Sequence, residues 1–355
     1  MRKIAKPHYG MLDLAKFLCA LLILLYHFFS EHGSLPMILE EALSSYAIAV
    51  ALFMGISGFL VFGKLGNIPT RQERWLVVRR QVWRILRIYL LWSIVYILYT
   101  IIRWNPDALS VRFLLLQLQQ WIFGSTFYTI WFMPALAVGL VAAFWLTELA
   151  PAYAAGIFAT LLYAIGALML TYRCVGEMLP GFAGIAGFAS VWLGGSRGWL
   201  LYALPLLLVG RAMAKYKNRH KEKSRFAWVL WLTLLLVSVT LMLAEALILR
   251  RFFGSTGIDM TILMPATVFC ALGFLTSIQI PESAYLLWMR KMSVLIFVTQ
   301  RIFLTVIPEL FPVLAEQVLF SNNYLAFVFC VGGTILFSAG IVLLSQKAKI
   351  LRLLY

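Results

Sequence analysis

A lysine and a histidine interrupt the first apolar stretch of the chain, LDLAKFLCALLILLYHFF, at residues 12–29. Lys16 and His27 are eleven positions apart. At about 100° per residue this is about 20° more than three full turns, so in a helix both side chains project from nearly the same face, about 16 Å apart along the axis. Asp13 lies one turn before Lys16 and offers it a counter-ion. This face suits a ligand that is anionic at one end and reacts with an imidazole at the other.

Two structural roles compete with this interpretation. Lys16 lies close enough to the helix start to extend to a membrane interface, and His27 lies close enough to the other end to be an ordinary interfacial residue. An ionisable group placed in lipid costs about 2.5 to 3.5 kcal/mol even on insertion scales, so it usually has a functional reason. We therefore predict a functional role for His27 and leave both roles open for Lys16.

A second basic group precedes the third apolar stretch, in RRQVWRILRIYLLW at residues 79–92. Arg80, Arg84 and Arg87 follow the helical spacing i, i+4, i+7 and would form one basic face. The planar guanidinium of arginine is well matched to phosphate. Basic residues at the cytoplasmic end of a helix also anchor it, and we assign Arg79 and Arg80 to that role. Arg87 lies deeper, and we predict that it faces a polar cavity.

Ten apolar stretches would form the helices that carry these residues. Of the 355 residues 63% are hydrophobic and only 12% are charged, which is unusual for a soluble domain. A spanning helix needs about 20 apolar residues, and these stretches are too long for barrel strands. We predict an all-α integral membrane protein with about ten transmembrane helices, at 12–30, 44–63, 84–102, 127–147, 151–171, 199–214, 227–249, 259–279, 286–307 and 323–345.

The formal net charge of +16 is distributed unevenly between the two sides that ten spans would define. Most lysines and arginines lie at the ends of the chain and in segments 64–87 and 211–225, which would share one side. The positive-inside rule then places both termini in the cytoplasm. The charge therefore predicts topology, and we expect the lipid bilayer rather than nucleic acid as a partner.

The first apolar stretch could also be a signal peptide. A basic start followed by an apolar run is typical of such a peptide, but we find no small-x-small cleavage site and expect the helix to be retained.

The four cysteines show no paired spacing, so we predict neither a metal site nor a disulfide framework. Glu245, near the end of the stretch 227–249, is expected to pair with Arg250 or Arg251.

These residues resemble the motifs of the acyltransferase-3 family, multi-pass bacterial enzymes that move acyl groups from cytoplasmic acyl-CoA to glycans and other acceptors. The first helix of that family carries a basic residue, ten intervening residues and a histidine, as Lys16 and His27 do. Its RxxR segment is matched by Arg84 and Arg87. Three more segments are similar and occur in the family's order: FMGISGFLVFGK (53–64), WFMPAL (131–136) and SRGWLLYALPLLLVGRAMA (196–214).

The resemblance implies a membrane-bound O-acyltransferase of the bacterial cell membrane. Acyl-CoA, expected as acetyl-CoA, would be the donor, and a hydroxyl of a cell-envelope glycan or lipid-linked acceptor would receive the group. Lys16, Arg84 and Arg87, with Asp13 beside Lys16, would bind the nucleotide. His27 would act as general base or carry the acyl group covalently, and the sequence leaves both open.

Five weaker candidates for acceptor binding or oxyanion support each have a structural alternative: Ser57, Trp131, Arg197, Gln300 and Arg301. We expect Gln300 and Arg301 to face the interior together. Many family members have a histidine where MSVLIFVTQR places Gln300, and glutamine cannot shuttle protons. The chain ends soon after the last apolar stretch, which predicts one membrane domain over residues 1–355 without a fused soluble domain. A separate extracytoplasmic transferase would then be an additional partner.

Other functions predict different features. A transporter or flippase for a polysaccharide or lipid-linked precursor commonly has two related halves, and we find no internal repeat. A glycosyltransferase would need acidic catalytic residues in a loop, and acidic residues are sparse. A non-catalytic membrane scaffold would not explain the alignment of Lys16 with His27. Transport is the main alternative to acyl transfer.

Overall fold

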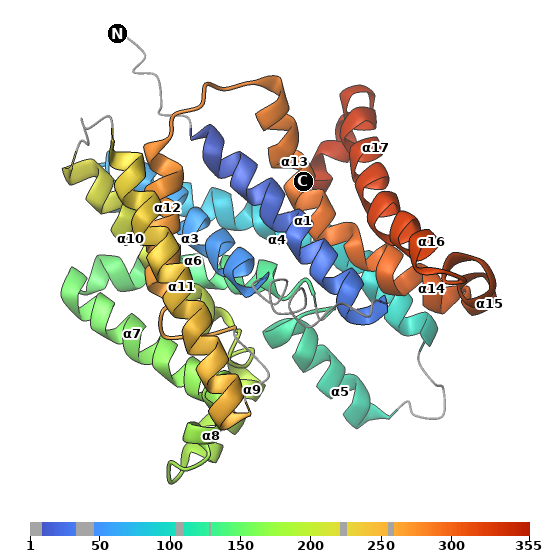
Figure 1. Ribbon diagram of the computed structural model, residues 1–355, viewed down its shortest axis with the longest axis horizontal. Coiled ribbons are helices and arrows are strands. Elements are labelled where there is room, and N and C mark those ends of the chain that lie inside the picture. Colours follow the sequence, from blue (N-terminus) through green and yellow to red (C-terminus); the bar gives the residue numbers. More distant parts are fainter. Residues whose placement is uncertain (1–8, 33–45, 104–109, 128, 221–225, 255–258) are drawn as a thin grey trace. The chain divides into compact units, whose positions relative to one another are not determined.

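The computed structural model describes residues 9–32, 46–103, 110–127, 129–220, 226–254 and 259–355, and these ranges contain helices and no β-strand (Figure 1). Eight helical segments within them are long and apolar enough to cross a membrane. They are α1 (Gly10–His32), α3 (Tyr46–Leu65), α4 (Arg71–Arg103), α6 (Phe132–Leu149), α7 (Ala152–Met169), α11 (Ala227–Phe253), α13 to α14 (Ala284–Leu310) and α16 to α17 (Asn323–Lys347). The chain is therefore an all-α, multi-pass membrane protein.

The other two predicted spans fall on shorter helices. The stretch 199–214 forms a π-helical turn, η3 (Trp199–Ala203), which continues into α10 (Leu204–Arg219). The stretch 259–279 contains α12 (Met264–Ser277), which has 14 residues. A straight helix of that length covers about 21 Å, less than the hydrocarbon layer of about 30 Å. The count of ten spans and the cytoplasmic location of both termini stay predictions.

The described helices group into two compact units. The first contains residues 1–49, 223–235 and 270–355, and the second contains residues 50–222 and 236–269. Each has buried apolar side chains of its own, such as Leu24 and Leu295 in the first unit and Leu140 and Leu207 in the second.

In the first unit, α1 packs along α13 (Ala284–Arg301), and Figure 1 shows the two helices side by side in blue and orange. They run in the same direction, because Asp13 contacts Arg290 near one end and His27 contacts Arg301 near the other. Gly10 lets the start of α1 come close to the chain before α13, since a Cβ there would lie 3.0 Å from the carbonyl oxygen of Ile280. α1 and α13 thus share one continuous interface, here called the seam, which runs from the Asp13–Arg290 contact to the His27–Arg301 contact.

In the second unit, α3 and α10 cross with their backbones in contact. A Cβ on Gly58 would lie 2.2 Å from the carbonyl oxygen of Leu207, and one on Gly210 would lie 2.1 Å from that of Gly55. Glycines at such positions are typical of closely packed membrane helices. α6 packs against α4, α10 and η3, so this crossing is part of a larger helical core.

α4 begins earlier than the predicted span at 84–102. The hydroxyl of Thr70 accepts a hydrogen bond from the backbone N–H of Glu73, 3.3 Å away, and so caps a helix that starts at Arg71. With 33 residues α4 is about 50 Å long, well beyond the roughly 30 Å of a bilayer core. Its basic first half therefore extends the spanning helix well before the predicted start at residue 84.

Candidate active site

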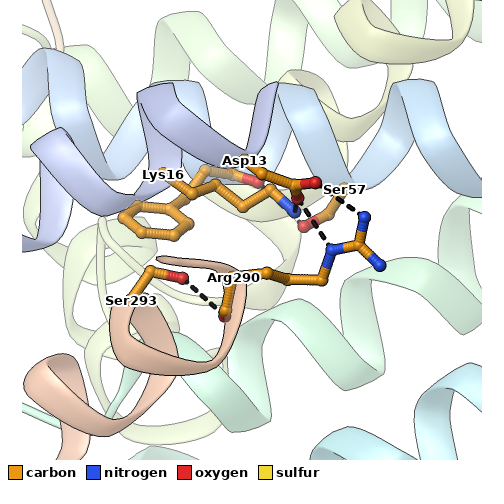
Figure 2. Close-up of polar contacts among 6 residues, drawn as sticks. Asp13, Lys16, Ser57, Arg290 and Ser293 are labelled. Atoms are coloured by element: carbon orange, nitrogen blue, oxygen red, sulfur yellow. Dashed lines mark hydrogen bonds and ion pairs between the residues drawn. The ribbon is translucent and has the colours of Figure 1, made fainter. Parts of the chain in front are cut away.

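A carboxylate and two cations form the first cluster on the seam between α1 and α13. Asp13 is only 4% exposed. Nε of Arg290 donates to its Oδ1 at 2.9 Å, Nη2 of Arg290 donates to its Oδ2 at 2.6 Å, and Nζ of Lys16 lies 3.5 Å from Oδ1 (Figure 2). The predicted pairing of Asp13 with Lys16 is confirmed. Arg290 is an additional partner that the sequence did not suggest.

The cluster brings several cationic side chains to one end of α1 and α13. Two cations, Lys16 and Arg290, contact the one buried carboxylate of Asp13. Arg290 is not enclosed, since 38% of its side chain is exposed. The next residue, Lys291, places its Nζ 5.6 Å from the ring centre of Tyr355, which adds a second cation at this end of α13. Such a group can attract an anionic ligand.

A second cluster surrounds His27 near the other end of the seam. Nη2 of Arg301 lies 2.9 Å from Nδ1 of His27, while Nη1 of Arg301 donates to the carboxylate of Glu31 and, at 3.3 Å, to Oγ1 of Thr305. Arg301 is 1% exposed and ends α13 directly before a π-helical turn, η4 (Ile302–Val306). The imidazole of His27 therefore contacts a side chain of α13.

The two clusters repeat one spacing on both helices. Lys16 and His27 lie eleven positions apart on α1, which is continuous between them, and Arg290 and Arg301 lie eleven positions apart on α13. Eleven residues rise about 16 Å along a helix. The predicted polar face of α1 therefore lies against a face of α13 that carries Arg290 and Arg301. Glu31 lies four positions after His27, and this helical spacing is the signal in the sequence that could have identified it as a member of the cluster.

Gln300 and Arg301 are both buried, as expected for an interior-facing pair. Nε2 of Gln300 donates to the carbonyl oxygen of Phe297 at 3.1 Å. Its Oε1 has no hydrogen-bond partner among the described residues, although the side chain is 0% exposed. A buried acceptor without a partner is uncommon in proteins and often marks a functional position.

The remaining predicted residues lie in the second unit. Arg84 is exposed, and Arg87 is half-buried with an Nε that has no partner within the described chain. Oγ of Ser57 donates to the carbonyl oxygen of Phe53 in its own helix, at 2.8 Å. Trp131 meets the ring of Tyr202 edge-on, with ring centres 5.9 Å apart. The roles predicted for these residues remain predictions.

Arg197, the last predicted residue of the second unit, forms an ion pair with Asp259. Asp259 opens a short segment that several side chains hold in place. Oγ1 of Thr171 accepts from the backbone N–H of Met260 at 3.0 Å, and the hydroxyl of Tyr163 donates to the carbonyl oxygen of Thr261 at 2.9 Å. The Arg197 pair is therefore part of a well-bonded segment before α12.

Glu245 does not have the partners that the sequence suggested. Instead of Arg250 or Arg251, its carboxylate accepts hydrogen bonds from the hydroxyl of Tyr172 and from the backbone N–H groups of Ile262, at 2.6 Å, and Leu263, at 3.1 Å. These N–H groups lie just before α12, where the helix leaves donors unsatisfied and attracts negative charge. Burial, and then the bond to Glu245, raise the pKa of the Tyr172 hydroxyl above its ordinary value.

Residues 9–343 match a family model described as an acyltransferase domain. An amino-acid racemase of Enterococcus faecalis is 23% identical over 331 residues, which cover 90% of this chain and 44% of the racemase, so the chain spans less than half the length of that relative. No solved structure matches the chain. Because the family model covers nearly the whole sequence, the chain belongs to the acyltransferase-3 family.

Proposed function

We propose that this protein is a membrane-bound O-acyltransferase that moves an acyl group, acetyl in the simplest case, from cytoplasmic acyl-CoA to a hydroxyl of a cell-envelope glycan or a related acceptor. The family supports the reaction class. The proposed donor and catalytic residue are supported by the seam. Lys16 and His27 lie eleven positions apart on α1, and the clusters that contain them each include an arginine of α13.

The chemistry of acyl-CoA fits the two ends of this seam. The donor carries phosphates at one end and a thioester at the end of an extended arm. The ammonium of Lys16 and the partly exposed guanidinium of Arg290 would donate hydrogen bonds to the phosphates. The separation of about 16 Å between Lys16 and His27 along α1 is of the same order as the length of the arm. Arg84 and Arg87, the RxxR match, are proposed as further phosphate ligands.

His27 is the proposed catalytic residue. In direct transfer, the acceptor oxygen attacks the thioester carbonyl carbon, the C–S bond breaks, and the hydroxyl proton passes by way of the imidazole to the sulfur of CoA. In covalent transfer, an imidazole nitrogen attacks first and releases CoA, and the acceptor hydroxyl then displaces the imidazole from the acyl group. Both routes give an ester and free CoA. Ser57, Trp131, Arg197 and Gln300 are proposed contributors to acceptor binding.

The racemase activity named for the Enterococcus faecalis relative is not assigned to this chain. More than half of that racemase lies outside the matched region, and the identity within the region is 23%. The matched region is the part that corresponds to the acyltransferase domain. We therefore base the proposal on the family.

Labelled acetyl-CoA supplied to membranes that contain the protein tests the proposal. The wild type should transfer label to a glycan or lipid-linked fraction, and His27→Ala should abolish transfer without lowering the amount of protein in the membrane. Ser30→Ala is the matched control, because Ser30 is exposed and lies on the same helix, and its hydroxyl donates to the backbone carbonyl oxygen of His27 rather than to the imidazole. Unchanged transfer in His27→Ala would reject the catalytic role. Movement of a precursor without consumption of acetyl-CoA would favour a transporter.

A further inference from the structure

We propose that Arg301, anchored by Glu31, is a positioning residue that holds His27 in the tautomer with its proton on Nε2. The consequence for catalysis rests on the proposed function, whereas the tautomer itself does not. The inference follows from the juxtaposition of three side chains, two on α1 and one at the end of α13.

The bond between Arg301 and His27 has only one possible direction. A guanidinium carries N–H donors and no acceptor, and it keeps its charge in proteins. Nη2 of Arg301 lies 2.9 Å from Nδ1 of His27, within hydrogen-bond distance. Arg301 must therefore donate and Nδ1 must accept. The nitrogen that accepts carries no proton, so in the neutral ring the proton is on Nε2.

The other two forms of the ring conflict with this contact. Both the Nδ1–H tautomer and the doubly protonated imidazolium would direct an N–H of His27 at an N–H of Arg301. Arg301 has little freedom to avoid this clash, because it is 1% exposed and its Nη1 is held by Glu31 and Thr305. The environment thus selects one tautomer, as the partner of the second nitrogen does in many histidine sites.

This tautomer determines which role His27 can take while Arg301 is bound to it. A general base or a nucleophile needs a nitrogen lone pair, and the lone pair of Nδ1 is engaged by Arg301. Nε2–H can donate a hydrogen bond, for instance to the carbonyl oxygen of a thioester. The lone pair becomes available only when the Nη2 contact opens.

Nitrogen-15 NMR of histidine-labelled protein tests the tautomer directly. The sequence has four histidines, and comparison with His27→Asn assigns the signal of His27. At pH 7 the wild type should show a protonated Nε2 and an unprotonated Nδ1. Arg301→Met, which removes the donor, should shift part of the population to the Nδ1–H form. An Nδ1–H or imidazolium signal in the wild type would overturn the inference, even if the variant fails to fold.

A kinetic comparison tests the positioning role. We expect Arg301→Met to lower kcat about tenfold or more with little change in the KM for acetyl-CoA, because removing the support of a catalytic group typically costs 10- to 100-fold. Arg301→Gln keeps an N–H donor for Nδ1 and should retain more of the activity. Thr305→Val removes the 3.3 Å bond to Nη1 but leaves the Nη2 contact with His27, so it should lower kcat less than Arg301→Met does.

The two arms separate the failure of this inference from that of the proposed function. If the wild type transfers no acetyl group, the proposed function fails, and the NMR result still decides the tautomer. If transfer is observed but Nδ1 carries a proton, the inference alone fails. If folded Arg301→Met keeps the wild-type kcat, Arg301 has no positioning role in the reaction.

Discussion

Asp13 and Arg290 lie 277 positions apart in the chain and form a two-point ion pair, in which Nε and Nη2 of Arg290 each donate to one carboxylate oxygen. The two-point geometry restricts the carboxylate more than a single contact would. The side chain of Asp13 is 5% exposed, so its charge depends on the partners that the protein provides. This pair fixes the register of α1 against α13 at the end opposite to His27.

The pair predicts non-additive effects on stability. Arg290→Met removes the two-point partner of a buried carboxylate and leaves Lys16 3.5 Å away, and we expect a loss of about 3 kcal/mol in unfolding free energy. Asp13→Asn should cost a similar amount, because two cations then face each other. The double variant should lose less than the sum, which thermal unfolding in detergent can measure as a double-mutant cycle. Additive losses would show that the contact between Asp13 and Arg290 contributes little to stability. Lys291→Met serves as the control, because Lys291 is the next residue of α13 and contacts the ring of Tyr355.

Arg80 and Arg87 provide a matched pair for testing the donor site. Both are on α4, but Arg80 is exposed, whereas Arg87 is half-buried with an Nε that lacks a partner in the described chain. A charge-assisted hydrogen bond contributes about 1.5 to 3 kcal/mol, equivalent to at least tenfold in affinity. Arg87→Gln should therefore raise the KM for acetyl-CoA about tenfold and change kcat little. Arg80→Gln should change KM less than twofold, and equal effects would contradict the role of Arg87.

Much of the seam could be predicted from the sequence, but only one of its two helices. Helical spacing places Asp13, Lys16 and His27 on one face of α1, and the structure keeps them there. The partner arginines are 274 and 277 positions away, and no local pattern states which of many apolar helices lies beside α1. The repeated interval of eleven positions in Arg290 and Arg301 is a signal that a comparison of helices could have used.

Two other differences between sequence and structure have physical causes. The polar stretch after Pro69 has the composition of a loop, but Thr70 caps it and no glycine or proline interrupts α4 after Arg71. Glu245 could not be assigned from charges because two of its partners are backbone N–H groups, which every residue except proline has. Tertiary capping of this kind follows only from the fold.

Glu245 is expected to stabilise the start of α12. Its carboxylate satisfies the backbone N–H groups of Ile262 and Leu263 and binds the hydroxyl of Tyr172. Glu245→Ala should lower the unfolding free energy by about 2 to 4 kcal/mol, because three donors lose a charged acceptor. Glu177→Ala is the control, since its pair with Arg173 is largely exposed and such pairs contribute about 0 to 1 kcal/mol. Equal melting temperatures for the two variants would contradict the capping role.

The bond from Tyr172 to Glu245 also predicts a dependence on alkaline pH. Burial, and then this bond, raise the pKa of Tyr172 above its ordinary 10.0, so the folded protein holds the proton more tightly than the unfolded chain. Stability from this source is complete below about pH 10 and is lost as the pH rises further. Tyr172→Phe should therefore differ most from the wild type at pH 7 to 9. A stability difference that grows above pH 10 would contradict this assignment.

Gln300 offers a test that separates stability from function. Its Oε1 is buried without a partner in the described residues, an arrangement that costs roughly 1 to 3 kcal/mol when no ligand supplies a donor. Gln300→Met fills a similar volume without that cost, so its melting temperature should equal or exceed that of the wild type. If Oε1 serves the reaction, acetyl transfer should fall at least tenfold in the same variant. Thr299→Val controls for a buried polar change, because Thr299 is next to Gln300 on α13 and the substitution removes its bond to Ser338 of α17. A destabilised Gln300→Met with unchanged transfer per folded molecule would assign Gln300 to packing alone.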